Sequence, residues 1–256
     1  MQNYIDINSK AIDKWVEEGW EWGVPVTRED FAKAKRGVWS VLLTPKKPVP
    51  VSWFAPLFHG GTFGRAKILG LASGGGQQMP IFAALGAECA VFDNSERQLE
   101  SERMVSLREG YSIDIVKGDM TKPLPFESGS FDLIFHPVSN CYIEDVRHVW
   151  RECWRLLKSG GILLSGMDYG LNYIVEDENP CLIVNKLPFN PLKDEDLYAR
   201  CLLEDGSIQF SHTIEEQVGG QMEAGFVLTG LYEDTDGSGI GEYIPNYVAT
   251  RAVKMQ

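Results

Sequence analysis

The sequence lacks the segments that direct a chain into a membrane. No stretch comes near the roughly 18 uninterrupted apolar residues of a membrane-spanning helix. Its start, MQNYIDINSK, has an acidic residue where a secretory signal peptide has a basic and then an apolar run. We therefore expect a cytoplasmic protein without a membrane partner.

Basic residues are scarce as well. The chain has 24 Lys and Arg against 36 Asp and Glu, which gives a net charge of −12. The densest basic stretch, around Lys33, Lys35 and Arg36, is short and has apolar neighbours. Because the average field repels phosphate backbones, we expect no nucleic-acid partner, and a small-molecule partner is favoured.

Metal-binding patterns are also missing. The five cysteines form no CxxC pair, and the four histidines include no pair at helical ligand spacing. The residues in question are Cys89, Cys141, Cys153, Cys181, Cys201, His59, His136, His148 and His212. An odd number of scattered cysteines fits reduced thiols, and we expect no structural metal.

Short apolar runs alternate with segments of helical period from about residue 66 onward. The helical segments carry recognisable ends, such as Pro80 in a first turn and Gly110 after a last turn. The expected strands are residues 66–72, 88–93, 112–116, 131–136 and 161–166, and the expected helices include 95–109 and 144–157. This alternation predicts an α/β fold with a doubly wound, mostly parallel sheet, covered by helices on both faces.

The C-terminal part of the pattern changes. Thr213 and Glu216 form a capping-box pattern, followed by an apolar stripe of Ile214, Val218 and Met222. Two further strands, at residues 226–232 and 247–253, are joined by a Gly/Asp-rich loop. A loop that short joins antiparallel neighbours, so we expect the sheet to end in an antiparallel hairpin.

Two regions fall outside the alternation. Residues 1–60 are rich in tryptophan and proline, and residues 168–212 contain two possible strands, at 181–187 and 207–212. We interpret the chain as a single domain over residues 1–256. Its core comprises residues 64–167 and 213–253, with 1–60 as an N-terminal helical extension and 168–212 as an inserted cap.

A glycine-rich turn marks the candidate ligand site. The segment AKILGLASGGGQQ, residues 66–78, runs from an apolar strand through Ser73 and three glycines into a helix start. Such a turn lets the backbone approach a ligand, although any tight turn needs glycine. The second strand ends at Asp93, about 20 residues past the glycines, where a ribose-binding carboxylate is expected. Asp119 and Met120 follow the third strand at the same sheet edge, so the pattern indicates a nucleoside ligand.

With these segments, residues 64–253 resemble the class I S-adenosylmethionine-dependent methyltransferases. The resemblance rests on LASGGG, VFDNSE, GDM, SFDLIFHPVS after PLPFESG, LLKSGGILL and the terminal hairpin. It implies S-adenosylmethionine as cofactor, with its methionine part against the turn, its ribose on Asp93 and its adenine near the residues that follow the second and third strands. The candidate cofactor residues are Ala72, Ser73, Gly74, Gly76, Gln77, Asp93, Asn94, Asp119, Met120 and His136.

The chain departs from the family pattern at two positions of this turn. The family usually has an acid where this chain has Gly70, and a glycine where it has Ala72. The missing acid commonly orients the turn, so Gln77 or Gln78 could take its place. Because this acid is absent, the sequence also allows a second function, that of a methyltransferase-like binding module without catalytic activity.

A nicotinamide-dependent dehydrogenase is the other alternative, because it shares the strand, the glycine turn and the ribose carboxylate. Such enzymes require Gly or Ala at the third position of the glycine motif, where close helix packing occurs. That position, counted from Gly74, is occupied by Met79. The terminal hairpin also favours the methyltransferase.

The sequence does not identify the methyl acceptor, but it suggests where the acceptor binds. The fourth strand ends in HPVSNCY, and in related enzymes this edge lies near the transferred methyl group. His136 is the candidate general base, although a histidine at a strand end before proline is more often a packing residue. We expect a small, partly apolar acceptor enclosed by the N-terminal region and the insertion. The candidate acceptor residues are Tyr4, Trp15, Trp20, Trp22, Asn140 and Tyr142. On this interpretation, a chain without residues 1–22 loses turnover but keeps cofactor affinity within about tenfold.

Overall fold

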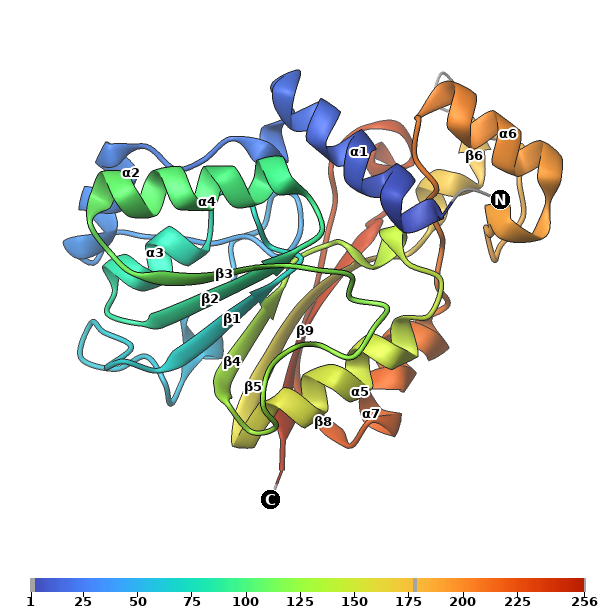
Figure 1. Ribbon diagram of the computed structural model, residues 1–256. Coiled ribbons are helices and arrows are strands. Elements are labelled where there is room, and N and C mark those ends of the chain that lie inside the picture. Colours follow the sequence, from blue (N-terminus) through green and yellow to red (C-terminus); the bar gives the residue numbers. More distant parts are fainter. Residues whose placement is uncertain (1–2, 177–178, 256) are drawn as a thin grey trace.

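The computed structural model describes residues 3–176 and 179–255, and its centre is a seven-stranded sheet (Figure 1). The strand order is β3-β2-β1-β4-β5-β9-β8. The strands are β1 (Lys67–Leu71), β2 (Glu88–Asp93), β3 (Ile113–Lys117), β4 (Phe131–His136), β5 (Leu157–Asp168), β8 (Phe226–Asp234) and β9 (Tyr247–Lys254). β1 to β5 are parallel and β9 is antiparallel to β5 and β8, which confirms the predicted fold class and terminal hairpin.

The central strands are apolar on both sides because both faces of the sheet are covered. On β1, Ile68 packs in one core with Phe54 and Phe82, whereas Leu69 packs in another with Trp150. Successive side chains of a strand point to opposite faces, so the two cores lie on opposite sides of the sheet. The continuous apolar runs in the sequence are the signature of this double burial.

The helices of the core begin and end close to the predicted residues. They are α3 (Met79–Ala84), α4 (Glu96–Glu109) and α5 (Val146–Leu156). Ser95 caps α4 by accepting a hydrogen bond from the Gln98 N–H, and Gly110 ends it with a φ of 72°, in the left-handed region that favours glycine.

One strand is longer than the sequence pattern indicates. β5 continues past Gly166 to Asp168, because Met167 and Asp168 pair with Val248 and Tyr247 of β9. A distant segment of the chain thus determines where β5 ends. The extension carries Asp168 to the carboxyl edge of the sheet.

The helix before β8 differs from the expected regular helix. The capping box of Thr213 and Glu216 is present, but a π-helical segment, η6 (Glu215–Gly219), precedes the short α7 (Gly220–Glu223). The wider turn changes the 3.6-residue period on which the predicted stripe depends. Val218 packs against the core, whereas Ile214 and Met222 are half exposed, so the prediction of a buried stripe is wrong at these two positions.

The N-terminal region and the insertion form the remaining elements. The first contains α1 (Tyr4–Glu17), η1 (Glu21–Gly23), α2 (Arg28–Lys35) and η2 (Val51–Phe54). The second contains η4 (Leu171–Tyr173), β6 (Val175–Glu176), β7 (Asn179–Ile183), η5 (Pro191–Lys193) and α6 (Glu195–Glu204). The expected strand at 181–187 is realised only in its first part, as β7, and the expected strand at 207–212 is wrong.

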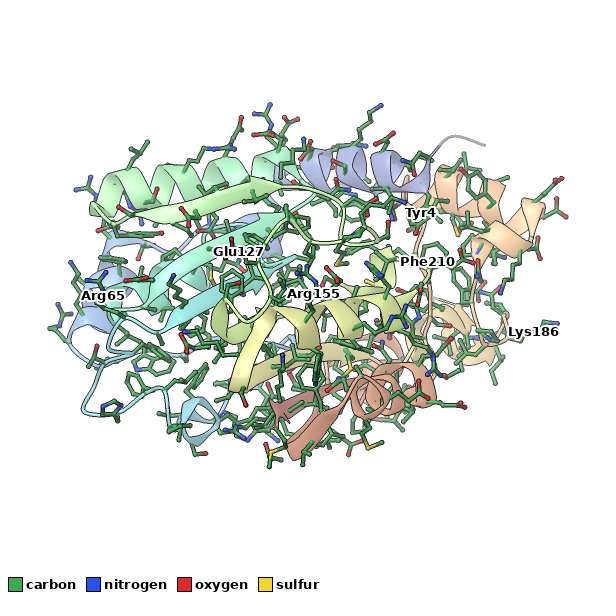
Figure 2. The ribbon with its side chains drawn as sticks, turned by 60° about the horizontal axis from the view of Figure 1, so that its bottom comes forward. Tyr4, Arg65, Glu127, Arg155, Lys186 and Phe210 are labelled. Carbon is green, nitrogen blue, oxygen red and sulfur yellow. The ribbon has the colours of Figure 1, made fainter. Side chains whose placement is uncertain are left out.

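In place of a strand, residues 207–212 are held by α1. The Asn8 amide donates to the Ile208 carbonyl at 2.8 Å and its Oδ1 accepts from the Ile208 N–H at 2.7 Å. Tyr4 packs its ring against the edge of Phe210, with centroids 5.2 Å apart (Figure 2). α1 therefore joins the insertion to α4, between which it lies (Figure 1). No helix of the described ranges is long and apolar enough to cross a membrane.

Candidate functional site

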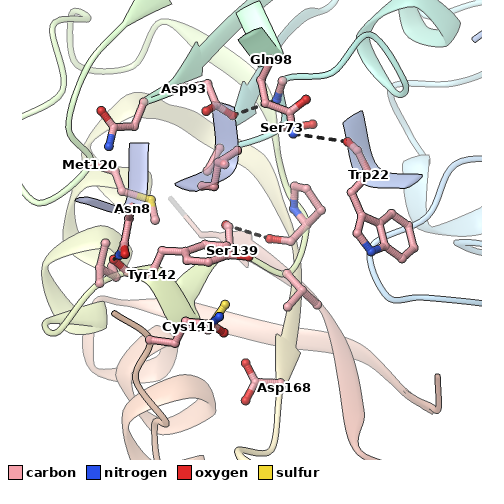
Figure 3. Close-up of a pocket in the computed structure, with 18 of the residues that line it drawn as sticks. Asn8, Trp22, Ser73, Asp93, Gln98, Met120, Ser139, Cys141, Tyr142 and Asp168 are labelled. Atoms are coloured by element: carbon pink, nitrogen blue, oxygen red, sulfur yellow. Dashed lines mark hydrogen bonds between the residues drawn. The ribbon is translucent and has the colours of Figure 1, made fainter. Parts of the chain in front are cut away.

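A cavity of about 340 Å³ lies at the carboxyl ends of the parallel strands, with α1 and η1 over one side (Figure 3). The sheet order reverses direction between β1 and β4, so the loops after these strands diverge. Ligands of open α/β sheets bind in the crevice that this divergence leaves. Figure 3 shows Asp93 and Asp168 on opposite sides of the cavity, and we call these the Asp93 end and the Asp168 end.

The glycine turn after β1 forms the wall of the Asp93 end. The Gly74 N–H donates to Asp93 Oδ2 at 3.0 Å, and a Cβ on Gly74 would lie only 2.6 Å from the Cβ of Gln98. Glycine is therefore required at position 74. Ala72, where the family has glycine, has a φ of 46° in the left-handed region, so the turn keeps the glycine-like backbone at some conformational cost.

The position that lacks the family's acid is filled by a neighbouring side chain. A Cβ on Gly70 would lie 2.9 Å from the Met79 sulfur, and Met79 is fully buried. Within the turn, Ser73 Oγ donates to Gln78 Oε1 at 3.1 Å. The Gln77 amide donates to the carbonyls of Glu21 and Val24, at 2.8 and 3.0 Å, and so ties the turn to the N-terminal region.

A buried acid on α4 supports the same turn from the other side. Glu102 Oε1 accepts a hydrogen bond from the Gly76 N–H at 2.9 Å. Burial raises the pKa of Glu102 to about 8, although the bond to Gly76 acts in the opposite direction. Gly76 faces α4 and Pro25 and does not line the cavity. Glu102 cannot be recognised from the sequence, because one acid among several on an amphipathic helix carries no signal of its own.

Asp93 lines the cavity and is held in place by backbone groups. Its Oδ2 accepts from Gly74 and its Oδ1 accepts from the Ser95 N–H at 2.9 Å. Burial raises the pKa of Asp93, and these hydrogen bonds lower it. A carboxylate offers about four acceptor positions. The acceptor positions that these backbone groups leave open face the cavity and are available to hydroxyl groups of a ligand.

The loop after β3 completes the Asp93 end. Asp119 Oδ1 accepts from the Thr121 N–H at 2.8 Å, and Met120 is buried beside it in the cavity wall. A Cβ on Gly118 would collide with the Phe92 ring, so only glycine fits there. Asn94 also lines the cavity, and its amide donates to the Ile5 carbonyl of α1 at 3.0 Å.

His136 is fully buried and does not line the cavity. Its Nδ1 lies 2.8 Å from the Leu71 carbonyl and its Nε2 lies 2.8 Å from the side-chain amide of Asn140, while burial lowers its pKa. A neutral imidazole has one N–H. Nδ1 therefore donates its proton to the Leu71 carbonyl. Nε2 then accepts a hydrogen bond, so the Asn140 amide presents its NH2 group to it. With the Asn140 amide in this orientation, its oxygen accepts a hydrogen bond from the Gln217 amide nitrogen, which is buried and has no other partner among the described residues. Neither ring nitrogen of His136 remains free for proton transfer.

The proposed acceptor residues fall into two groups. Trp20, Trp22 and Tyr142 line the cavity, whereas Tyr4, Trp15 and Asn140 do not. Trp15 packs against both Trp20 and Tyr142, with centroids 5.5 and 6.4 Å away. The Trp22 carbonyl accepts from the Gln98 amide at 3.3 Å, beside the glycine turn. The N-terminal region thus covers the Asp93 end of the cavity.

The Asp168 end consists of residues that the sequence analysis did not select. Asp168 lies at the end of β5, and its Oδ1 accepts from the Gly170 N–H at 2.7 Å. Burial raises the pKa of Asp168 to about 6. The other polar residues lining this end are Asn172, Tyr173, Gln209 and Tyr247. In the sequence, the segment GMDYG marks Asp168 as an acid close to a strand end. The predicted strand stops at residue 166, however, which places Asp168 in the insertion.

The charges around the cavity all have one sign. Its described lining includes the acids Asp93, Asp119 and Asp168, and it contains no lysine or arginine. The described part of the chain also contains no cluster of three His, Cys, Asp or Glu side chains that could hold a metal ion. The site can accept hydrogen bonds from hydroxyl and amino groups, and it has no basic side chain for a phosphate.

Comparisons with known proteins give a consistent family. A methyltransferase domain family matches residues 69–165. The uncharacterized methyltransferase YbaJ of Bacillus subtilis is 42% identical over 261 residues, covering 100% of both chains. Among solved structures, an S-adenosylmethionine-dependent methyltransferase from Mesorhizobium loti has a TM-score of 0.57 at 20% identity, covering 74% of this chain and 91% of its own. A geranyl diphosphate methyltransferase solved with GPP and sinefungin has a TM-score of 0.53 at 15% identity, covering 75% and 72%. The two structural likenesses show the fold alone.

Proposed function

This chain belongs to the methyltransferases, and we propose that it is an S-adenosylmethionine-dependent enzyme of class I. It binds S-adenosylmethionine at the Asp93 end of the cavity and methylates a small molecule at the Asp168 end. The pairing of Asp93 with the Gly74 turn is the observation that carries the proposal. It places a carboxylate with free acceptor positions beside a backbone surface that only glycine permits.

The lining of the Asp93 end fits this cofactor. Asp93 has room for the two ribose hydroxyls, and the backbone from Ala72 to Gly74 suits the methionine part. Asp119 and the apolar Met120 suit the amino group and the ring of adenine. S-adenosylmethionine has no phosphate, in agreement with a described lining that holds no lysine or arginine.

The alternative functions are less well supported. A dinucleotide site needs Gly or Ala at position 79, where the buried Met79 fills the space above Gly70. The absence of an acid at position 70 favours a non-catalytic binding module. The turn is nevertheless supported by Gln78 and Glu102, so the absence of that acid does not leave it without support.

The chain's own residues perform positioning and exclusion of water. When bound, S-adenosylmethionine supplies an activated methyl group on a positively charged sulfur, and such chemistry depends mainly on orientation in a dry pocket. Trp20 and Trp22 are the aromatic residues of the N-terminal region that line the cavity, and they keep water from the site. His136 connects the end of β1 to Asn140 in η3 (Asn140–Tyr142), and so positions the Tyr142 wall.

The test uses S-adenosylmethionine labelled on its methyl group. The purified protein is incubated with this substrate and a cell extract, which is then separated into small molecules, nucleic acid and protein. We expect the label in the small-molecule fraction, in amounts that depend on the enzyme. Label in nucleic acid, or no transfer to any fraction, would contradict the proposal, and the latter result would favour a binding module.

A further inference from the structure

Resting on the proposed function, we infer that Asp168 is the residue that binds the reacting group of the acceptor, and that the acceptor is a small amine. The residues that carry this inference are at the Asp168 end of the cavity, away from the glycine turn (Figure 3). Nothing at that end is needed to bind the nucleoside part of the cofactor.

The geometry of Asp168 leaves one of its oxygens available. Oδ1 is occupied by the Gly170 N–H, whereas Oδ2 has no hydrogen-bond partner among the described residues. Asp168 is also fixed in position, because it ends a strand that pairs with β9 through Tyr247. Asp168 is largely buried and lines the cavity, so Oδ2 is open to the cavity, where a ligand that donates a hydrogen bond offsets part of the desolvation cost of the carboxylate.

The side chains around Asp168 are already engaged with one another. The Tyr173 ring stacks on Phe189 with centroids 4.9 Å apart, and its hydroxyl donates to Gln209 Oε1 at 2.9 Å. The Tyr247 hydroxyl accepts from the Asn172 amide at 3.3 Å. These contacts hold the two aromatic rings in place in the wall of the cavity.

The charge of the lining selects the kind of group that binds. With Asp168 and no basic residue in its described lining, the Asp168 end disfavours an acceptor that carries a carboxylate or phosphate. An ammonium group donates hydrogen bonds, neutralises Asp168 and is attracted to the faces of aromatic rings. A hydroxyl group satisfies only the first of these conditions, so the amine fits the site best. For transfer, the ammonium gives one proton to Asp168, and the freed nitrogen lone pair bonds to the methyl carbon as the carbon–sulfur bond breaks, with that electron pair remaining on sulfur.

The experiment compares ligands that differ only in the reacting group. The probes are 2-phenylethylamine, 2-phenylethanol and 3-phenylpropionate, together with hexylamine, hexanol and heptanoate. Each is titrated by NMR into the protein saturated with S-adenosylhomocysteine. We expect each amine to bind more tightly than its alcohol, and each carboxylate to bind most weakly. Asp168→Asn, which keeps the shape and one oxygen, should weaken amine binding at least about tenfold, the loss expected for a charged hydrogen bond.

A matched control separates a local effect from a general change in charge. Asp132 lies near the other end of β4, where it contacts Lys158 at 2.8 Å. Asp132→Asn removes the same charge and should leave amine affinity unchanged. S-adenosylhomocysteine should bind equally well to the wild type and to both variants, which also verifies that each variant is folded.

A second measurement requires no variant. As the pH falls from 7.5 to 5, Asp168 takes up a proton while the amine stays charged, so the affinity for the amine should fall and that for the alcohol should not. The other titratable groups that face Asp168 are Cys141, Tyr173, Tyr247 and His212, together with Tyr142, whose pKa is also raised by burial. Burial raises the pKa of the first three, so they stay uncharged over this range. Asp168→Asn removes the titrating carboxyl group, so it should abolish the pH dependence.

The outcomes distinguish this inference from the proposed function. If S-adenosylhomocysteine does not bind the wild type, the proposed function fails. If it binds but neither amine binds more tightly than its alcohol and carboxylate partners, the inference alone is overturned. Unchanged amine affinity in Asp168→Asn, or an affinity for the amine that does not change with pH, has the same consequence.

Discussion

Glu102 on α4 accepts the N–H of Gly76 at 2.9 Å, so an acid from the neighbouring helix supports the glycine turn at the cofactor site. Glu102 is fully buried, and its second oxygen has no partner among the described residues. The turn thus depends on a group whose charged form is disfavoured where it lies.

The first prediction concerns stability against pH. The pKa of Glu102 is raised from 4.5 to about 8, so its neutral form favours the folded state. The stabilisation is complete below pH 4.5, and it is lost at about 1.4 kcal/mol per pH unit as the pH rises toward 8. Glu102→Gln keeps an oxygen for Gly76 and removes the titration. We expect the variant to be more stable than the wild type at pH 8 by a few kcal/mol.

Urea unfolding at pH 5, 6.5 and 8 measures this effect. The difference between Glu102→Gln and the wild type should grow with pH. Glu109→Gln on the same helix, where the acid pairs with Arg108, is the control and should show no such growth. Parallel pH curves for Glu102→Gln and the wild type would show that Glu102 titrates normally.

The second prediction concerns the pair that replaces the family's acid. Gly70→Ala brings a Cβ to 2.9 Å from the Met79 sulfur, and such overpacking costs about 1–3 kcal/mol. Met79→Ala leaves a cavity and costs about 2–5 kcal/mol. Because the two changes offset each other sterically, the double variant should lose less stability than the sum. Calorimetric unfolding of all four proteins measures the coupling, and simple additivity would contradict the proposed packing.

The third prediction concerns His136. Both of its ring nitrogens are in contact with protein atoms, and burial lowers its pKa, so it does not exchange protons with a substrate. His136→Gln should lower the free energy of unfolding by about 1–3 kcal/mol through the lost buried hydrogen bonds. Its pH profile of methyl transfer should keep the wild-type shape. A profile that loses an acid limb in the variant would restore His136 as the general base.

The fourth prediction revises the role of the N-terminal segment. The sequence alone predicts that residues 1–22 contact only the acceptor, so that cofactor affinity stays within about tenfold after their removal. In the structure, the Ile5 and Trp22 carbonyls bind Asn94 and Gln98, both of which line the Asp93 end. We now expect the truncated protein to lose more than tenfold in affinity for S-adenosylhomocysteine. Retained affinity in a folded truncation would support the original assignment.

The sequence predicted the part of the fold that depends on local patterns. The strands from 66 to 166 are apolar because both faces of the sheet are covered, and the helix ends follow from caps such as Ser95 and Gly110. Features fixed by distant contacts were not predictable in the same way. β5 reaches Asp168 only through pairing with β9, and the segment 207–212 is held by Asn8 instead of by a strand partner.

The site followed the same division. Gly74, Asp93 and Asp119 stand at strand ends, and the topology of a parallel sheet brings them to one edge. Trp15 and Tyr4 are aromatic like Trp20 and Trp22, but they pack against other rings outside the cavity lining. Composition alone cannot separate an aromatic residue of a pocket wall from one behind it.

The central claim is tested most directly by calorimetric titration of S-adenosylhomocysteine into the wild type, Asp93→Ala and Asp132→Asn. Asp93 supplies the acceptor positions for the ribose and is held by Gly74 and Ser95, whereas Asp132 lies at the opposite end of the sheet. We expect binding to the wild type and to Asp132→Asn, and a loss of about 1–3 kcal/mol in Asp93→Ala. Unchanged affinity in Asp93→Ala, or binding of NADH in place of S-adenosylhomocysteine by the wild type, would contradict the account.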